Sequence, residues 1–374
     1  MTAGTGHRRA AEALAQALGE SYPTADVQCL DVLTYAPQTF HAFYARSYLF
    51  LVRHLPWVWK LSYRLLDCGV IYRCVQPVRR AWNLRITRRF VQRLNDQPPD
   101  LIVSTHFIPA DVCSDGRKKG WLAAPLVVVV TDLYPHRFWI SPEADALVVS
   151  TPEGASTLRQ RGIAESRIHV VGIPIGKAFG QPVDREVLRG RLKLQPERRT
   201  VLVTSGGTTV GQFERVVESL IALESGLPGR LQLLIVCGED EGARARLLAH
   251  AKHLRMPTRV LGFVDDMADL MAVSDLMVAK AGGLTISEAL GSGLPMILYH
   301  IIPGQERMNA EYVARAGAAV IAPRPADVMR SVRQCVEEPG RLEAMARAAK
   351  QLGHPRAAED IVTQVIRPLV IHGR

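Results

Sequence analysis

The chain has little of what marks membrane-spanning or disulfide-stapled proteins. No apolar run in its 374 residues reaches the roughly 20 residues that a bilayer-spanning helix needs, so no such span is predicted. The six cysteines are scattered, with no close pairs of the kind that bind metal ions. This spacing favours reduced thiols in a cytosolic protein over a disulfide framework or a zinc site. Internal repeats and low-complexity tracts are also lacking.

Acidic residues are scarce in one segment, residues 46–93, where Asp67 is the only acid among eleven Lys and Arg. The segment's net charge of +10 equals that of the whole chain, and Trp, Tyr and Leu are mixed with the basic residues. This composition suits the interface of an anionic membrane. The alternative is a solvent-exposed helical segment whose aromatic residues pack on its own domain. Nucleic-acid binding is less favoured, because no nucleic-acid motif accompanies the positive charge. The residues expected at the membrane or acceptor are Trp57, Trp59, Arg79 and Arg80.

Two series of short apolar runs alternate with helical segments. The alternation predicts an α/β protein with parallel sheets covered by helices on both faces, and two series predict two doubly wound, Rossmann-like domains. Ligands bind such sheets beyond the carboxyl ends of the strands. The first series comprises residues 27–33, 101–105, 126–131, 146–150 and 169–172, and the second comprises 201–205, 231–237, 259–264, 276–279 and 295–299.

The most informative turn follows the run 276–279. Gly282 and Gly283 open a helix there, so backbone N–H groups can approach a phosphate, which the helix dipole also favours. Glu288 is expected in the first turn of this helix, where a carboxylate can accept hydrogen bonds from ribose hydroxyls. A nucleotide diphosphate-sugar needs both contacts. Stabilisation of the helix dipole is the alternative role for Glu288, and Lys280 is either a phosphate ligand or a surface lysine.

Several motifs together resemble the diacylglycerol glycosyltransferases, which include the monogalactosyldiacylglycerol synthases and the processive diacylglycerol glucosyltransferases. This family is related to the peptidoglycan N-acetylglucosaminyltransferase. The familiar Lys-Pro-Gly-Gly turn has Ala281 in place of its proline. The motifs span nearly the whole chain and comprise Thr5-Gly6-His7 with the helix behind it, Ser205-Gly206-Gly207, Gly262-Phe263-Val264, the run from Gly282 to Ala289, and Pro303-Gly304-Gln305-Glu306.

The resemblance implies a GT-B fold, in which two Rossmann-like domains face each other across a cleft. It implies a UDP-sugar donor in the C-terminal domain, a diacylglycerol or glycosyl-diacylglycerol acceptor at the N-terminal domain, and inversion at the anomeric carbon. We therefore expect a hexosyltransferase bound peripherally to the cytoplasmic, inner face of the cell membrane. The alternatives are the same architecture acting on another lipid-linked or soluble acceptor, and a nucleotide-sugar-binding protein without catalysis.

Three residues are predicted to be catalytic. His7 lies at the amino end of a helix, where the dipole should keep the imidazole neutral as a base or phosphate ligand; a capping or core role is the alternative. Asp132 follows the most hydrophobic run and is expected to point into the cleft as a proton acceptor, or else to cap the next turn. His136 completes an Asp-His-Trp arrangement similar to the family's. His106 is a weaker candidate at the same edge.

The donor-binding residues implied by the resemblance lie in the C-terminal half. The turn 205–208 can offer N–H groups to the diphosphate, the segment 262–264 can meet the uracil, and the pair 305–306 can bind sugar hydroxyls. A plain strand-to-helix turn, a buried strand end and a helix start are the respective alternatives. The predicted set is Ser205, Gly206, Gly207, Thr208, Phe263, Val264, Gly282, Gly283, Leu284, Thr285, Glu288, Gln305 and Glu306.

Domain limits follow from Pro and Gly clusters. We expect an N-terminal acceptor domain over residues 1–172, a donor domain over 173–353, and a helix over 354–374 that returns to the N-domain. Only three residues precede the first glycine loop, where this architecture has a strand, so we expect the start to lie downstream of an apolar segment of about six residues. No Asp-x-Asp motif occurs, so we expect no metal and no cofactor beyond the UDP-sugar co-substrate.

Overall fold

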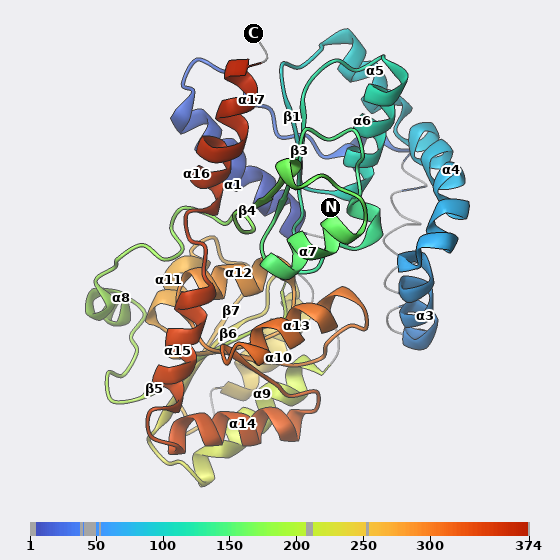
Figure 1. Cartoon of the computed structure of the whole chain (residues 1–374). Helices are drawn as coiled ribbons and strands as arrows, with labels where there is room; N and C mark the ends of the chain where they lie inside the picture. Colours follow the sequence, from blue (N-terminus) through green and yellow to red (C-terminus); the bar gives the residue numbers. More distant parts are fainter. Residues whose placement is uncertain are drawn as a thin grey trace. The chain divides into compact units, whose positions relative to one another are not determined.

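The computed structural model describes residues 5–37, 40, 50–51, 54–206, 212–251 and 254–372. It divides the chain into two compact units (Figure 1). Unit 1 comprises Met1–Gly176, Pro303–Gln305 and Arg356–Arg374, and unit 2 comprises Lys177–Ile302 and Glu306–Pro355.

Unit 1 contains a four-stranded parallel sheet in the order β1-β2-β3-β4. Leu126 and Val128 of β2 pack into the core on one face, and Val127 and Val129 pack into the core on the other. All four side chains are fully buried, which explains why this strand is apolar at every position rather than at alternate ones. The strands are β1 (Ile102–Ser104), β2 (Leu126–Val129), β3 (Ala146–Val149) and β4 (Ile168–Val170).

Helices cover both faces of this sheet. Helix α1 (Thr5–Ser21) uses Ala13, Leu14 and Ala17 to pack on one face together with the C-terminal helical stretch, and Figure 1 shows α1 beside α16. Helices α5, α6 and α7 supply the core of the other face, and α4 packs on α6. The remaining bounds in unit 1 are η1 (Val32–Tyr35), α3 (Pro56–Asp67), α4 (Gly69–Ile86), α5 (Arg88–Asp96), α6 (Phe107–Lys119), η2 (Arg137–Trp139), α7 (Pro152–Gln160), η3 (Glu165–Arg167), α16 (Ala357–Ile361), η5 (Val362–Ile366) and α17 (Arg367–His372).

The strand predicted over residues 27–33 is wrong. This stretch is irregular, and Asp31 caps the short helix η1 by accepting a hydrogen bond from the Leu33 N–H at 3.0 Å. Leu30 is 42% exposed, and only Val32 and Leu33 reach the core. Apolar residues without a neighbouring strand to pair with do not make a strand, and the pattern alone could not supply that neighbour.

Unit 2 contains a six-stranded parallel sheet in the order β10-β9-β8-β5-β6-β7. All five strands predicted here are confirmed, and β10 was missed although it lies in the apolar run 318–322. The strands are β5 (Arg199–Thr204), β6 (Leu231–Val236), β7 (Thr258–Leu261), β8 (Leu276–Ala279), β9 (Met296–Leu298) and β10 (Ala319–Ile321). The helices are α8 (Arg185–Arg191), α9 (Phe213–Ile221), η4 (Ala222–Ser225), α10 (Glu241–Ala251), α11 (Met267–Val273), α12 (Gly283–Gly291), α13 (Gln305–Arg315), α14 (Pro325–Glu337) and α15 (Arg341–Leu352).

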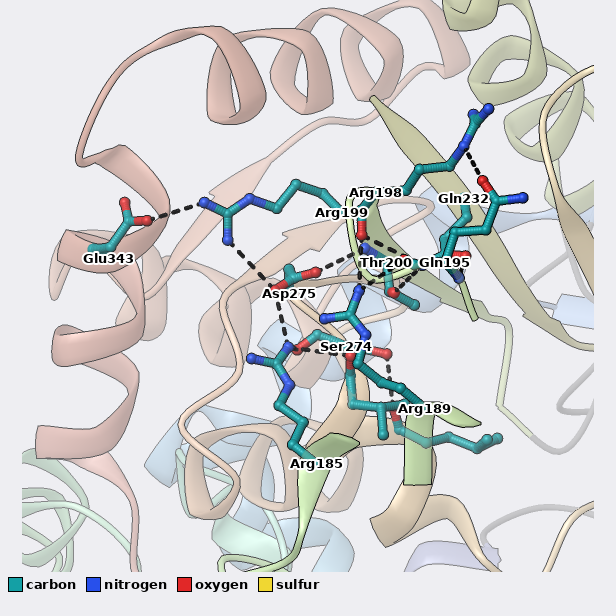
Figure 2. Close-up of polar contacts among 12 residues, drawn as sticks. Arg185, Arg189, Gln195, Arg198, Arg199, Thr200, Gln232, Ser274, Asp275 and Glu343 are labelled. Carbon is teal, nitrogen blue, oxygen red and sulfur yellow. Dashed lines mark hydrogen bonds and ion pairs between the residues drawn. The ribbon is translucent and has the colours of Figure 1, made fainter. Parts of the chain in front are cut away.

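A polar network closes the amino edge of the unit 2 sheet (Figure 2). Asp275, just before β8, accepts a hydrogen bond from the Thr200 N–H at 2.7 Å and an ion-paired bond from Arg185 at 2.9 Å. Gln232 donates to the Thr200 hydroxyl at 3.0 Å. In parallel sheets of this kind ligands bind at the opposite, carboxyl edge.

Candidate functional site

The carboxyl edge of the unit 2 sheet brings predicted turns together. Strands β9, β8 and β5 are neighbours and parallel, so the segments that follow them leave the sheet at one edge. These segments are 205–206, 280–283 and 299–302. Ser205 is buried, and the Gly206 N–H donates to the Thr204 hydroxyl at 3.3 Å. Gly207 and Thr208 lie outside the described residues.

The amino end of α12 has a glycine as its N-cap. Gly282 is its N-cap, with extended backbone (φ −67°, ψ 138°) and no side chain to bond the first-turn N–H groups. Gly283, Leu284 and Thr285 form that first turn. Backbone N–H groups at a helix start that no side chain caps are a preformed site for phosphate or carboxylate.

Lys280 joins this turn to the 205–206 turn. Its Cε lies 3.9 Å from the point where a Cβ of residue 206 would stand, so Gly206 leaves the lysine stem room to pass. Burial lowers the pKa of Lys280, and the nearby Glu306 carboxylate raises it in part. A poorly hydrated ammonium beside two glycine turns is a strong binding group for a diphosphate, because little water must be removed from it.

Glu306 holds the segment after β9. Its Oε2 accepts a hydrogen bond from the Ile302 N–H at 2.9 Å, and burial raises its pKa while that bond and Lys280 lower it. Gln305 begins α13 and is partly exposed. One carboxylate oxygen of Glu306 therefore fixes the loop, and the sugar-binding roles of Gln305 and Glu306 stay predictions.

The remaining donor-binding predictions occupy different environments. The first-turn position expected for Glu288 is wrong: it is the sixth residue of α12, because the helix begins at Gly283. Glu288 is only 4% exposed, a burial that a carboxylate tolerates only with partners. Phe263 is 58% exposed and Val264 is partly exposed, so the aromatic ring presents a free face on which a flat base could stack. The uracil and ribose roles of these residues stay predictions.

Sequence reasoning missed His300 at the same edge. This residue adopts a left-handed backbone (φ 44°), which is uncommon for a residue with a side chain. Burial and the Lys280 charge lower its pKa. The signal was available, since His300 is the first polar residue past the buried run 295–299, the same position that singled out Asp132 after its own strand.

The site in unit 1 centres on His7, in the first turns of α1. Its Nδ1 lies 3.0 Å from the Thr105 carbonyl oxygen and 2.6 Å from Thr131 Oγ1. Because a carbonyl only accepts, Nδ1 carries the proton and Nε2 holds the lone pair. Burial lowers the pKa of His7 to about 4, although the Thr105 bond raises it in part. His7 is thus a neutral imidazole at physiological pH whose Nε2 can act as a base.

Aromatic side chains surround this imidazole. The ring of His106 meets it edge-on at 4.7 Å between centroids, and that of Trp139 lies at 6.0 Å. The Nδ1 of His106 accepts a hydrogen bond from the Ile108 N–H at 3.1 Å, which makes His106 the N-cap of α6. This bond favours the structural role for His106.

Asp132 and His136 lie on one loop but have different surroundings. Asp132 is partly exposed at the end of β2. His136 is buried, its Nδ1 accepts from the Phe138 N–H at 3.2 Å, and its Nε2 lies 3.1 Å from the Tyr63 carbonyl oxygen, to which it donates. With both nitrogens engaged, His136 is better placed to hold the loop than to transfer a proton.

Asp67 ties helix α3 to this loop. Its carboxylate accepts from Arg161 at 2.8 Å and from the Arg137 N–H at 3.0 Å. Arg161 also donates to the Tyr134 hydroxyl at 2.9 Å. The one acid of the basic segment is therefore structural, and it fixes the end of α3 beside the residues that follow Asp132.

Helices α3 and α4 expose an apolar and basic surface, which we call the α3–α4 face. The side chains of Trp57 and Trp82 are 66% and 54% exposed, whereas Trp59 is partly buried. Its exposed apolar residues are Trp57, Leu61, Leu65, Val70, Val78 and Trp82, and its exposed basic residues are Lys60, Arg64, Arg73 and Arg85.

The expected membrane contact of Arg79 and Arg80 is at odds with the structure. Both pair with the buried Asp111 of α6, at 3.0 and 3.5 Å, and Arg79 also stacks over the Phe138 ring at 4.6 Å. Only 12% of the Arg79 side chain and 19% of the Arg80 side chain are exposed. A buried carboxylate requires a cation, and these two arginines supply it.

The described residues hold neither a metal-binding cluster nor a membrane-spanning helix. No three or more His, Cys, Asp or Glu side chains come together in them as a metal ion would require. Within the same residues, no helix is long and apolar enough to span a membrane.

The depressed histidine pKa values predict an acid-sensitive unit 1. In the folded chain His7 stays neutral down to about pH 4, whereas the unfolded chain takes up a proton near pH 6.5. The unfolded state thus binds more protons between these values, so the free energy of unfolding should fall as the pH drops from 6.5 towards 4, by at most about 1.4 kcal/mol per pH unit for this residue. Urea unfolding across this range should show a shallower fall for His7→Gln. An unchanged pH dependence would mean that His7 titrates normally in the fold.

Comparison with known proteins covers nearly the whole chain. Residues 7–175 match the model of the monogalactosyldiacylglycerol (MGDG) synthase family, and residues 200–361 match the glycosyltransferase family 28 C-terminal domain. A processive diacylglycerol beta-glucosyltransferase of Bacillus licheniformis is 28% identical over 313 residues, covering 82% of this chain and 79% of that protein. A processive diacylglycerol beta-glucosyltransferase of Bacillus cereus (strain B4264) is 28% identical over 322 residues, covering 86% of this chain and 80% of that protein.

Solved structures agree on the fold. MurG of Acinetobacter baumannii superposes with a TM-score of 0.56 at 19% identity, over 76% of this chain and 78% of that one. The UDP complex of Staphylococcus aureus MnaA superposes with a TM-score of 0.57 at 14% identity, over 79% of this chain and 82% of that one. The predicted α/β architecture of the GT-B class, with two parallel sheets, is confirmed. This chain is a glycosyltransferase: residues 7–175 belong to the MGDG synthase family, and residues 200–361 are a glycosyltransferase family 28 C-terminal domain.

Proposed function

We propose that this glycosyltransferase moves a hexose from a UDP-sugar to diacylglycerol, or to a glycosyl-diacylglycerol, with inversion at the anomeric carbon. The observation that carries the donor half is the carboxyl edge of unit 2, where the uncapped start of α12 and the desolvated Lys280 stand beside the 205–206 turn. The names of the relatives support the acceptor, and they make UDP-glucose the first donor to test.

The proposed chemistry is a single displacement. The acceptor hydroxyl oxygen bonds to the anomeric carbon as the bond from that carbon to the diphosphate oxygen breaks, and attack from the opposite side inverts the configuration. His7 Nε2 takes the hydroxyl proton, which its neutral state and protonated Nδ1 allow. The start of α12 and Lys280 stabilise the negative charge that grows on the departing UDP. Asp132 orients the acceptor or the imidazolium.

The test is product analysis with the complete chain. Vesicles containing diacylglycerol are incubated with UDP-glucose, UDP-galactose or UDP-glucuronate, and lipids are identified by mass spectrometry and the anomer by NMR. We expect a β-linked glycosyl-diacylglycerol, and a second sugar if transfer is repeated. UDP release without a glycolipid would favour another acceptor, and UDP binding without release would favour a protein that only binds nucleotide-sugar.

We also propose that the α3–α4 face holds the enzyme peripherally on the inner surface of an anionic membrane. Its tryptophans suit the interface, and each of its Lys or Arg residues near the lipid adds about 1 kcal/mol. Membrane binding of this kind would bring the acceptor to unit 1 without a spanning helix.

Salt dependence tests this surface. Binding to vesicles with anionic phospholipid should weaken steeply as NaCl rises from low to physiological concentration, because exposed charges are screened. Arg64→Gln, on α3, should weaken binding severalfold at low salt. Lys118→Gln removes the same charge from the end of α6 and serves as the matched control. Equal losses in the two variants would mean that net charge, and not this face, drives binding.

A further inference from the structure

The hydroxyl of Tyr63 is a buried polar group without a hydrogen-bond partner in the described part of the chain. Its ring packs against His136 at 4.4 Å between centroids and lies 6.4 Å from that of Trp59. A buried hydroxyl that makes no bond is unusual and costs stability, so such a group in a folded protein calls for an explanation. The ring is well packed, and only the oxygen lacks a role.

One of the charged groups around this oxygen is Asp132, which the sequence predicted to be catalytic. Burial raises the pKa of Tyr63, and among its neighbours the Asp132 carboxylate raises it most, followed by Asp67. Tyr134 raises it and Arg161 lowers it to a smaller extent. The phenol therefore stays protonated throughout the physiological pH range. It can donate a hydrogen bond and accept another, as a partner for an alcohol must.

The position of this hydroxyl is fixed. The backbone carbonyl of Tyr63 accepts from His136 Nε2 at 3.1 Å, and four residues on Asp67 is bound by Arg161 and by the Arg137 N–H. The opposite side of α3 carries Trp57, Leu61 and Leu65, all exposed. One short helix thus connects the lipid-facing surface to the Asp132 loop, with Tyr63 on its inner side.

We propose that the Tyr63 hydroxyl binds the glycerol end of the lipid acceptor and positions its reacting hydroxyl beside Asp132. This inference rests on the proposed function, since it assumes an acceptor with a free alcohol. The orphaned oxygen is then satisfied when the acceptor is bound.

Tyr63→Phe tests the inference, because it removes the oxygen and keeps the ring against His136. We expect kcat/KM for diacylglycerol to fall about 10-fold, the worth of one lost hydrogen bond, with the KM for UDP-sugar unchanged. The melting temperature should hold or rise, since an unsatisfied polar group has been removed. Tyr72→Phe is the matched control: the Tyr72 hydroxyl is already bonded by Arg79 at 3.1 Å, so this variant should lose stability without a change in kcat/KM for the acceptor.

An unchanged kcat/KM for diacylglycerol in Tyr63→Phe would overturn the inference, whatever happens to the melting temperature. A failure of this inference is separated from a failure of the proposed function by measuring the direct binding of dioctanoylglycerol to the unmodified chain and to Tyr63→Phe. If the unmodified chain makes no glycolipid, the proposed function fails on its own. Equal binding of dioctanoylglycerol to both proteins, or no binding to either, would then also overturn the role of Tyr63, and weaker binding to the variant would support it.

Discussion

Substitution of His7 by glutamine is expected to lower the turnover number for glycolipid formation by about 10²- to 10⁴-fold, the usual contribution of a positioned general base. Glutamine can still donate an amide N–H to the Thr105 carbonyl oxygen, which His7 Nδ1 approaches at 3.0 Å, so the start of α1 should keep its place. It has no lone pair of comparable basicity to replace Nε2. Steady-state kinetics with saturating diacylglycerol measure the loss, and UDP titration should show an unchanged dissociation constant.

The pH profile identifies the base independently. A base acts when it is unprotonated, and the pKa of His7 lies at about 4, so the acid limb of kcat/KM should fall near pH 4 and not near pH 6.5. His250→Gln, an exposed histidine of α10, is the matched control and should leave both turnover and profile unaltered. If His7→Gln turns over at the normal rate, the proton goes elsewhere, and Asp132 becomes the next residue to replace.

The structure makes α3 more than a surface helix. Asp67 and the Tyr63 carbonyl bind the loop that carries Asp132 and His136, so movement of α3 cannot leave that loop unchanged. Contact between the exposed side of α3 and a membrane would therefore change the geometry of the proposed acceptor site. The basic segment, residues 46–93, contributes the proposed lipid-binding surface, and through Tyr63 and Asp67 it also holds the loop of the proposed acceptor site.

Local patterns in the sequence predicted the local structure on which the candidate site depends. The glycine turn at 282–283 and the helix behind it depend on residues within a few positions, and so does the place of His7 in the first turns of α1. Strands in the unit 2 sheet were predicted well because they are buried on both faces and read as continuous apolar runs.

Contacts between residues far apart in the sequence account for the features of the site that the sequence did not predict. Arg79 and Arg80 look like surface cations, and nothing near them shows that Asp111 would be buried beneath them. Tyr63 reads as one more aromatic residue of an amphipathic helix, since its position against His136 depends on residues 70 or more places away. The pairing of His7 with Thr131, 124 residues apart, is likewise a product of the tertiary fold.

The second large effect is expected at Lys280. Lys280→Met should weaken UDP binding about 10- to 100-fold, because charge-assisted hydrogen bonds to an anion contribute about 1.5–3 kcal/mol each. Methionine keeps most of the stem that passes Gly206 and removes only the ammonium. Isothermal titration calorimetry should show weaker binding of UDP and near-normal binding of uridine, which has the base and ribose but no phosphate.

Two further variants separate phosphate binding from a general disturbance of this edge. Lys350→Met removes one charge from the exposed side of α15 in the same unit and should leave UDP affinity unchanged. Loss of Lys280 also leaves Glu306 without its neighbouring cation, which would raise the pKa of that carboxyl further. Glu306→Gln removes this complication while an amide oxygen can still accept from the Ile302 N–H. If the ammonium itself holds the diphosphate, the double variant binds UDP as weakly as Lys280→Met alone; recovery of affinity in the double variant would instead assign the loss to an unpaired Glu306.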